Sequence, residues 1–110
     1  MLSKELVAAS TEPIVLAILA EGESYGYAII QRVRALSAEQ IEWTDGMLYP
    51  VLHRMEKRGL IQARWGESET GRKRKYYALQ NDGQKAIAEH HRQWSLVQSV
   101  LSGLRKEQYV

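Results

Sequence analysis

The chain has no cysteine, only two prolines, and no apolar run long enough to cross a bilayer. Without cysteine it has no disulfide, no thiolate metal ligand and no cysteine nucleophile, which suits a reducing cytoplasm. A membrane-spanning helix needs roughly 18 or more apolar residues, and the apolar stretch Pro13–Ala20 is far shorter. The N-terminus also lacks a basic segment followed by a small-residue cleavage site, so we expect an unprocessed, soluble protein.

The composition is typical of one folded domain. The 110 residues are 45% hydrophobic and 25% charged, without internal repeats or low-complexity tracts. Residues 1–45 carry three Lys or Arg against seven Asp or Glu, residues 46–75 carry eight against three, and residues 76–110 carry four against three, giving balances of −4, +5 and +1. A basic patch in an acidic frame attracts polyanions, although a hairpin solvated by surface lysines and arginines also explains it.

The first helix is predicted from a start pattern at Ser10–Pro13. A polar cap followed by proline in the first turn is typical of a helix N-terminus. The apolar run that follows reaches Gly22, which we expect to end the helix. Leu6 and Val7 indicate an earlier packed turn, with Pro13 bending the join between the two.

A second helix is expected from Tyr25 to about Leu36. Its apolar positions recur at helical spacing and form one stripe: Tyr25, Ile29, Val33 and Leu36. Residues 41–43 alternate between apolar and polar side chains, which predicts a very short strand.

A third helix is predicted from about Asp45 to Arg58, with Thr44 or Asp45 as its cap and Gly59 just beyond its end. Pro50 lacks the N–H that would bond the carbonyl of Gly46, so its first turns are expected to be distorted. The predicted buried stripe is Leu48, Val51, Leu52 and Met55. The predicted outer face is Tyr49, Pro50, His53, Arg54 and Lys57.

A β-hairpin is predicted next. Leu60–Trp65 alternates as a half-buried strand, Gly66–Gly71 forms a polar turn, and Lys75–Leu79 makes the second strand. Trp65 and Trp43 are expected to seal the hairpin and the short strand to the core. Tyr76 and Tyr77 are adjacent in the second strand, so one points inward and the other toward the hairpin surface.

A long helix is expected from Asn81, as its cap, to about Leu104. Its apolar residues would be exposed on a single copy, so we assign them to a dimer interface: Ile87, Trp94, Val97, Leu101 and Leu104. The order of elements predicts a mainly α (α+β) fold, a winged helix-turn-helix with a long C-terminal dimerisation helix. Residues 1–80 would form the DNA-binding domain and residues 81–110 the dimerisation helix, in one compact unit.

The third helix and the hairpin are the candidate DNA-binding elements. A helix fits the major groove, where its outer side chains can bond phosphates or base edges. The hairpin adds four consecutive cations that can reach the backbone or the minor groove: Arg72, Lys73, Arg74 and Lys75. Because neighbours on a strand alternate, either Arg72 and Arg74 or Lys73 and Lys75 would face the DNA together.

Three segments carry a resemblance to a known family. They are Tyr25–Ile29 (YGYAI), Leu48–Glu56 (LYPVLHRME) followed by Gly59–Ile61, and Gly71–Leu79 (GRKRKYYAL) followed by Gly83. In order and spacing they resemble the PadR transcriptional regulators over almost the whole chain. The resemblance implies a bacterial or archaeal homodimeric repressor, cytoplasmic and nucleoid-associated, that binds an inverted-repeat operator and is relieved by a small molecule or another signal.

The chain looks closest to the short branch with a single C-terminal helix, some of whose members bind planar aromatic drugs. In such relatives a tryptophan at the place of Trp94 faces its symmetry mate across a central pore. The resemblance therefore implies multidrug binding at Trp94, with Leu6, Ala17, His90, His91 and Gln98 as neighbours. The alternative is that Trp94 simply packs in the dimer core.

Three residues depart from the family pattern. Met47 stands where Ser or Thr usually begins the recognition helix, which removes a phosphate contact. Pro13 lies inside a helix that is usually continuous, so the preceding turn is expected to be displaced. Gln80 replaces the usual Thr before the last helix and leaves the capping to Asn81.

Other functions find little support in the sequence. His90 and His91 are adjacent and point about 100° apart on a helix, so they cannot share one metal ion. No catalytic set and no phosphate-binding glycine loop can be assembled, so we expect no enzyme activity, no cofactor and no metal. The alternative to a DNA-binding regulator is a winged-helix module for protein interaction, which would carry a less basic hairpin and a more apolar third helix.

Overall fold

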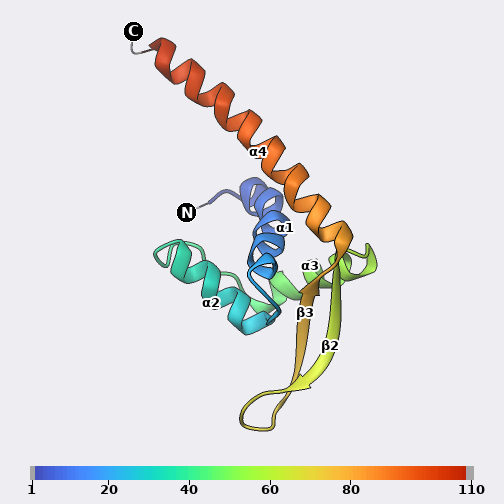
Figure 1. Ribbon diagram of the computed structural model, residues 1–110. Coiled ribbons are helices and arrows are strands. Elements are labelled where there is room, and N and C mark those ends of the chain that lie inside the picture. The colour runs from blue at the N-terminus through green and yellow to red at the C-terminus, as the bar shows by residue number, and fades with distance from the viewer. Residues whose placement is uncertain (1, 109–110) are drawn as a thin grey trace.

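The computed structural model describes residues 2–108 as four helices and a small three-stranded antiparallel sheet (Figure 1). In chain order the elements are α1 (Lys4–Ala20), β1 (Ser24–Tyr25), α2 (Gly26–Leu36), α3 (Asp45–Lys57), β2 (Ile61–Glu67), β3 (Lys73–Leu79) and α4 (Asn81–Gln108). The predicted mainly α fold with a hairpin and a long C-terminal helix is confirmed.

Helix α1 begins earlier than its sequence pattern predicts. Ser3 is the N-cap, and its hydroxyl accepts the N–H of Leu6 at 3.2 Å. The start predicted at Ser10–Pro13 is wrong, because the Thr11 hydroxyl donates back to the carbonyl of Val7 at 2.6 Å instead of capping a new helix. Pro13 lies inside α1, which continues as one unbroken helix on both sides of it.

The short strand lies elsewhere than predicted. Residues 41–43 form a loop in which the Trp43 side chain is buried in the core, whereas Ser24–Tyr25 pairs with β3. The third strand therefore comes from the segment between α1 and α2. Of the apolar stripe of α2, Ile29 and Val33 are buried, whereas Leu36 at the helix end is exposed.

Helix α3 follows its sequence signals closely. The Thr44 side chain accepts the N–H of Met47 at 3.2 Å and caps the helix. The helix ends just before Gly59, whose φ of +76° lies in the left-handed region that favours glycine. Pro50 does not interrupt the assigned helix.

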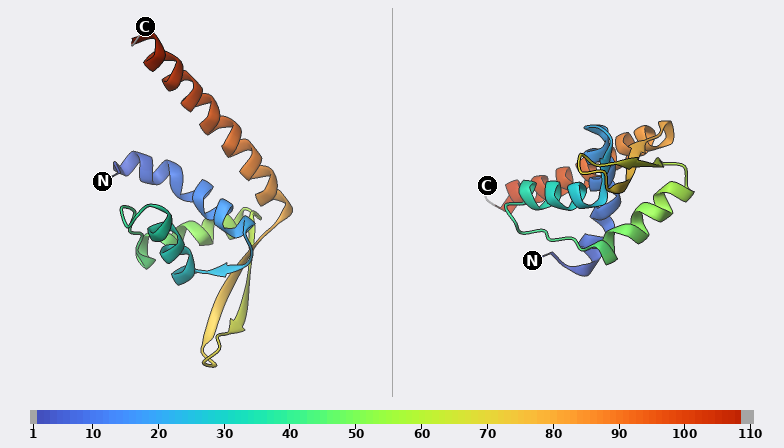
Figure 2. Two further views of the ribbon diagram at one scale, coloured as in Figure 1. Left: turned by 60° about the vertical axis from the view of Figure 1, so that its left-hand side comes forward. Right: turned by 90° about the horizontal axis from the view of Figure 1, so that it is seen from below.

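Strands β2 and β3 form the predicted hairpin, with β3 between β1 and β2 in the sheet. Their register runs from Ile61 opposite Leu79 to Glu67 opposite Lys73, so β3 begins two residues before the predicted Lys75. The far end of the hairpin projects beyond the helices (Figure 2).

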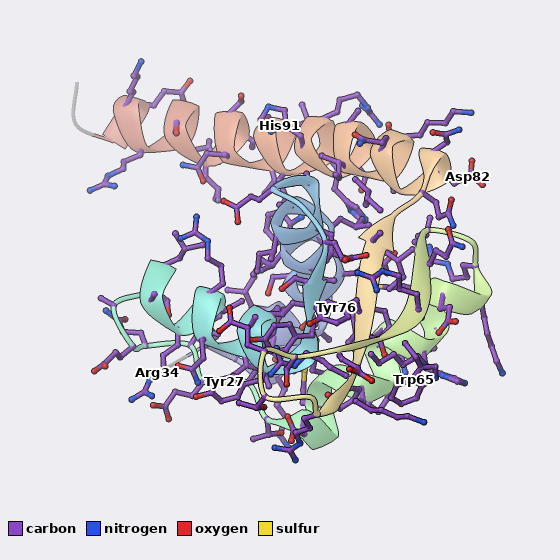
Figure 3. The ribbon with its side chains drawn as sticks, turned by 60° about the horizontal axis from the view of Figure 1, so that its bottom comes forward. Tyr27, Arg34, Trp65, Tyr76, Asp82 and His91 are labelled. Carbon is purple, nitrogen blue, oxygen red and sulfur yellow. The ribbon has the colours of Figure 1, made fainter. Side chains whose placement is uncertain are left out.

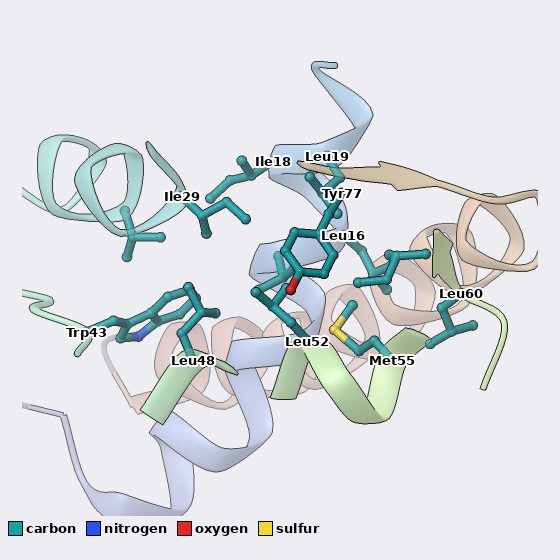
Figure 4. Close-up of a cluster of buried hydrophobic side chains, with 13 residues drawn as sticks. Leu16, Ile18, Leu19, Ile29, Trp43, Leu48, Leu52, Met55, Leu60 and Tyr77 are labelled. Carbon is teal, nitrogen blue, oxygen red and sulfur yellow. The ribbon is translucent and has the colours of Figure 1, made fainter. Parts of the chain in front are cut away.

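The hydrophobic core lies where α1, α2, α3 and the base of the hairpin meet (Figure 4). Its buried apolar residues are Val15, Leu16, Ile18, Leu19, Ile29, Val33, Trp43, Leu48, Leu52, Met55, Leu60, Ile61 and Tyr77. Trp43 is buried as expected. Trp65 is 69% exposed, so the prediction that it seals the hairpin to the core is wrong.

Helix α4 leaves the body of the molecule (Figure 1). Its first turn is closed by the N–H of Gln84 bonding the carbonyl of Gln80 at 3.0 Å, so Gln80 and not Asn81 stands at the N-cap position. Every side chain over residues 91–107 is exposed. Among the described residues no helix combines the length and apolarity needed to span a membrane.

Gly83 allows α4 to start against the base of the hairpin. A Cβ at this position would overlap the Leu60 carbonyl oxygen and lie 2.7 Å from Leu79 Cδ1. The backbone carbonyl cannot move aside easily, because it accepts the N–H of Gln80 at 3.0 Å. A side chain here would push α4 away from the base of the hairpin.

We therefore expect Gly83→Ala to lower the free energy of unfolding by about 2 kcal/mol, as overpacking does. Thermal or urea denaturation would measure it. Gly103→Ala is the matched control, because Gly103 is also in α4 but has nothing within 4 Å of its Cβ position. The control should be neutral or stabilising by about 0.5–1 kcal/mol, and equal effects of the two substitutions would contradict the close approach.

Candidate nucleic-acid interface

An open groove lies between α3, the hairpin and the start of α2. Two kinds of side chain line it together with Gly26 and Pro50. The aromatic side chains are Tyr25, Tyr27, Tyr49, His53, Trp65 and Tyr77, and the cationic ones are Arg54, Arg72, Lys73, Arg74 and Lys75. Of the nine residues predicted to bind DNA, only Lys57 does not border this groove; it is exposed at the last turn of α3.

The two faces of α3 separate core from surface as the helical spacing predicts. Leu48, Leu52 and Met55 are buried, and Val51 is half-buried against them. Every residue of the predicted outer face is exposed: Tyr49, Pro50, His53, Arg54 and Lys57. Met47 is half-buried and packs against the core, which accounts for a thioether where a polar side chain was expected.

The hairpin presents its cations on both faces. Lys75 points toward α3, where its Nζ lies 3.8 Å from the Glu56 carboxylate and 5.7 Å from the centre of the Tyr77 ring. Arg74 points to the other face and stacks on Tyr25, 3.8 Å from the ring centre. Because Tyr25 itself borders the groove, both alternating pairs of cations border it as well.

A stack of rings and guanidinium groups fastens the hairpin to β1. Tyr25 meets Tyr76 edge to face, with ring centres 5.7 Å apart and an interplanar angle of 78°. The Arg64 guanidinium lies over the Tyr76 ring, 4.8 Å from the ring centre. The contacts form a chain from Arg64 through the two tyrosine rings to Arg74. Each contact, cation–π or aromatic, favours this stacked arrangement. They fix the hairpin relative to α2.

Ion pairs divide the arginines and lysines into two groups. Arg64 forms a two-pronged pair with Glu23, with Nε to Oε2 at 2.8 Å, and this hydrogen bond holds the pKa of Glu23 below its usual value. Arg58, at the end of α3, pairs with Glu12 of α1 at 2.9 Å. Within residues 2–108, five cations of α3 and the hairpin form no ion pair: Arg54, Lys57, Arg72, Lys73 and Arg74. These charges are available to a polyanion.

The sequence patterns do not predict three of the aromatic side chains of the groove. Tyr25 is predicted as part of the apolar stripe of α2, Tyr27 stands only in a motif and Trp65 is expected in the core, yet all three border the groove. The motif did contain a clue, since Gly26 between the two tyrosines lies under the Tyr49 ring. A Cβ on Gly26 would lie 2.6 Å from the Tyr49 hydroxyl oxygen and 2.9 Å from Cζ.

The residues assigned to the dimer and effector lie on α1 and α4, and Figure 3 shows one of them, His91 on α4, far from Trp65 of the hairpin. On α1, Leu6 and Ala17 are exposed, and α1 packs beside α4. On α4, His90 and Ile87 are half-buried, whereas the remaining members are exposed: His91, Trp94, Val97, Gln98, Leu101 and Leu104. Ile87 packs against the hydrophobic core of the single chain, whereas the exposed members on α4, from His91 to Leu104, are not covered by any other described segment.

Three helices, a hairpin and a cationic groove between α3 and the hairpin define a winged-helix DNA-binding protein. The family model described as "Transcriptional regulator PadR-like family" matches residues 15–89. The chain belongs to this family and is therefore a DNA-binding transcriptional regulator. The members of this family are regulators rather than enzymes.

Solved structures of transcriptional regulators agree with this assignment, and one curated relative is similar in sequence. A transcriptional regulator from Clostridium thermocellum superimposes with a TM-score of 0.82 at 29% identity, covering 91% of this chain and 97% of that one. A PadR-like transcriptional regulator from Bacillus cereus gives 0.80 at 28% identity, covering 92% and 96%. An uncharacterised protein from Lysinibacillus sphaericus is 28% identical over 92% of this chain and 93% of its own length.

The contact between Gly26 and Tyr49 generates a prediction about DNA binding. We expect Gly26→Ala to displace the exposed Tyr49 side chain and to weaken DNA binding on the order of tenfold, the effect of one lost polar contact to a charged group. A fluorescence anisotropy titration with the DNA upstream of the coding sequence would measure it. Gly103→Ala should bind as the wild type does. Unchanged affinity in Gly26→Ala would show that Tyr49 does not contact the DNA.

Proposed function

We propose that this regulator is a sequence-specific repressor that binds an inverted-repeat operator as a homodimer. Helix α3 would lie in the major groove, and the hairpin would contact the flanking backbone. The single observation that supports this best is the shared groove, where the exposed polar face of α3 and the cations of the hairpin border the same space.

The chemistry of α3 fits a base-reading helix. Tyr49, His53 and Arg54 project from successive turns of its exposed face and can donate hydrogen bonds to base edges or phosphates. Lys57 stands at the end of the same face and suits a phosphate beside the groove. Hairpin cations such as Arg72 add contacts that are independent of sequence and strengthen binding at low salt.

The exposed seam of α4 supports a dimer. Trp94, Val97, Leu101 and Leu104 are separated by three, four and three residues, the spacing of a seam that packs against a second helix. All four are exposed in a single chain. Pairing with a second copy would bury them, at roughly 25 cal/mol for each Å² of apolar surface removed from water. Residues 81–110 would thus serve dimerisation, and residues 1–80 DNA binding.

A two-fold dimer also determines the kind of operator. Its two α3 helices would enter successive major grooves on one side of the duplex, about 34 Å apart. Each half-site would be read by one copy in opposite orientation, so the operator would be an inverted repeat. An alternative role as a protein-interaction module is disfavoured by the unpaired cations of the groove, which a polyanion would neutralise.

Replacing Arg54 and Lys57 by Ala should abolish the gel shift of the DNA upstream of the coding sequence, because both charges lie on the exposed face of α3. The affinity of the wild type for DNA should fall by orders of magnitude between about 50 and 200 mM salt, because the protein cations release counterions from the DNA phosphates. Lys4→Ala with Lys85→Ala removes the same charge outside the groove and should retain the shift. Sedimentation velocity should show a dimer in every variant; retained binding by the Arg54 and Lys57 variant would mean that α3 is misassigned.

We further propose that a planar aromatic molecule binds between the α4 seams of the dimer and regulates DNA binding. Trp94 is 40% exposed, with His90 and Val97 along the same seam and Leu6 exposed on the adjacent α1. Ala17, His91 and Gln98 are the further neighbours assigned to this site. The dimer would have two states, one in which the spacing of its α3 helices fits DNA and one in which it does not. The ligand would lower DNA binding only to the extent that it binds the second state more tightly than the first.

Adding planar aromatic dyes should quench the tryptophan fluorescence, because a stacked ligand lies against the Trp94 indole. The quenching should be lost in Trp94→Ala, whereas Leu36→Ala, an exposed apolar residue on α2, should leave it unchanged. Binding of the dye should also lower affinity for DNA. Quenching that survives in Trp94→Ala would place the ligand elsewhere.

A further inference from the structure

Trp65 is the most exposed of the large apolar side chains among the described residues, at 69% of its surface. It lies on the same face of β2 as Ile61 and Ala63, because alternate residues of a strand share a face. Ile61 is buried and Ala63 half-buried, so exposure rises along the strand as it leaves the core. Trp65 is therefore on the face toward α3, beyond the point where the core ends.

No described segment covers this indole, although the other face of the hairpin is well covered. There Tyr76 is held between Arg64 and Tyr25 and is only half exposed. Trp65 has Lys75 opposite it in the register of β3 and borders the groove that includes Arg54. The hairpin thus keeps its one tryptophan uncovered beside cations.

A second copy of the chain docked on α4 would not cover Trp65 either. The hairpin and the free half of α4 point away from opposite sides of the core (Figure 1). Figure 3 shows Trp65 beside α3, far from His91 on α4. The α4 seam and the Trp65 surface therefore need different partners.

The residues around Trp65 are suited to bind a polyanion that also has apolar groups. Lys73 lies on the same strand face as Lys75, and Lys73 has no ion pair within residues 2–108. The indole offers two apolar faces and one N–H donor, so it can pack on a deoxyribose ring while its N–H bonds a phosphate oxygen. Double-stranded DNA supplies both groups along each strand.

We propose that Trp65 is a DNA-contacting residue of the hairpin, which packs its indole against the sugar–phosphate backbone beside the site occupied by α3. This inference rests on the proposed mode of DNA binding by α3 and the hairpin. The contact strengthens binding without reading sequence. It also differs from the contacts of the neighbouring cations, because it releases no counterion.

The first test compares Trp65→Ala with Lys73→Ala by anisotropy titration over a range of salt concentrations, with the upstream duplex and with a duplex of unrelated sequence. Trp65→Ala should weaken binding to both duplexes about tenfold, as expected for a lost hydrogen bond to a charged group, with an unchanged slope of log affinity against log salt. Lys73→Ala should reduce that slope by about 0.9. Trp65→Phe keeps the apolar ring but lacks the N–H donor and should recover only part of the affinity, and Leu36→Ala should bind as the wild type does.

The second test follows the indole directly. In the Trp94→Phe background, quenching by acrylamide reports Trp65, because Trp43 is buried. Either duplex should protect this fluorescence from acrylamide. The thermal midpoint of Trp65→Ala should match that of the wild type, since the side chain is exposed.

The outcomes separate this inference from the proposed function. Wild-type affinity in Trp65→Ala, or unprotected fluorescence in the complex, would overturn the Trp65 contact while DNA binding stands. A loss confined to the upstream duplex would overturn the backbone contact in favour of a base contact. If the wild type itself binds neither duplex, the proposed function fails and the Trp65 contact fails with it.

Discussion

The burial of one face of α3 in the core is the contact on which the rest of the structure depends. Leu48, Leu52 and Met55 have almost no exposure, and at helical spacing this turns Tyr49 and Arg54 outward. The Arg58 pair with Glu12 of α1 fixes the end of the same helix. Rotating α3 would expose three large apolar side chains, so the polar face is held in place by packing.

Two elements leave this core in different directions and have unlike surfaces. The hairpin carries aromatic rings and unpaired cations into the groove beside α3, where Gly26 leaves room for Tyr49. Helix α4 starts at the close approach of Gly83 to the hairpin base and carries an apolar seam without charge at its centre. One surface suits a polyanion and the other a second apolar helix, so DNA binding and the proposed dimerisation would use separate surfaces.

Prediction from sequence succeeded where the pattern is local and failed where it depended on packing. Thr44, Gly59 and the period of the apolar residues define α3, because capping and amphipathicity act within one helix. Ser10–Pro13 has the same composition as a helix start, yet Ser3 caps α1 and the Thr11 hydroxyl bonds within it. The alternation at residues 41–43 did not produce a strand, because the third strand position beside β3 is occupied by Ser24–Tyr25.

The sequence by itself determined the family, the order of the elements and the polar face of α3, since these follow from short motifs and helical periodicity. Only the tertiary structure decided which side chains share the groove. Strand register placed Tyr25 under Arg74 and Lys75 opposite Trp65. The alternation of Trp65 with polar neighbours predicts a core residue. Along β2, however, the core ends before the position of Trp65. The packing of segments that are distant in the sequence determines where the core ends. The local alternation of apolar and polar residues therefore cannot predict it.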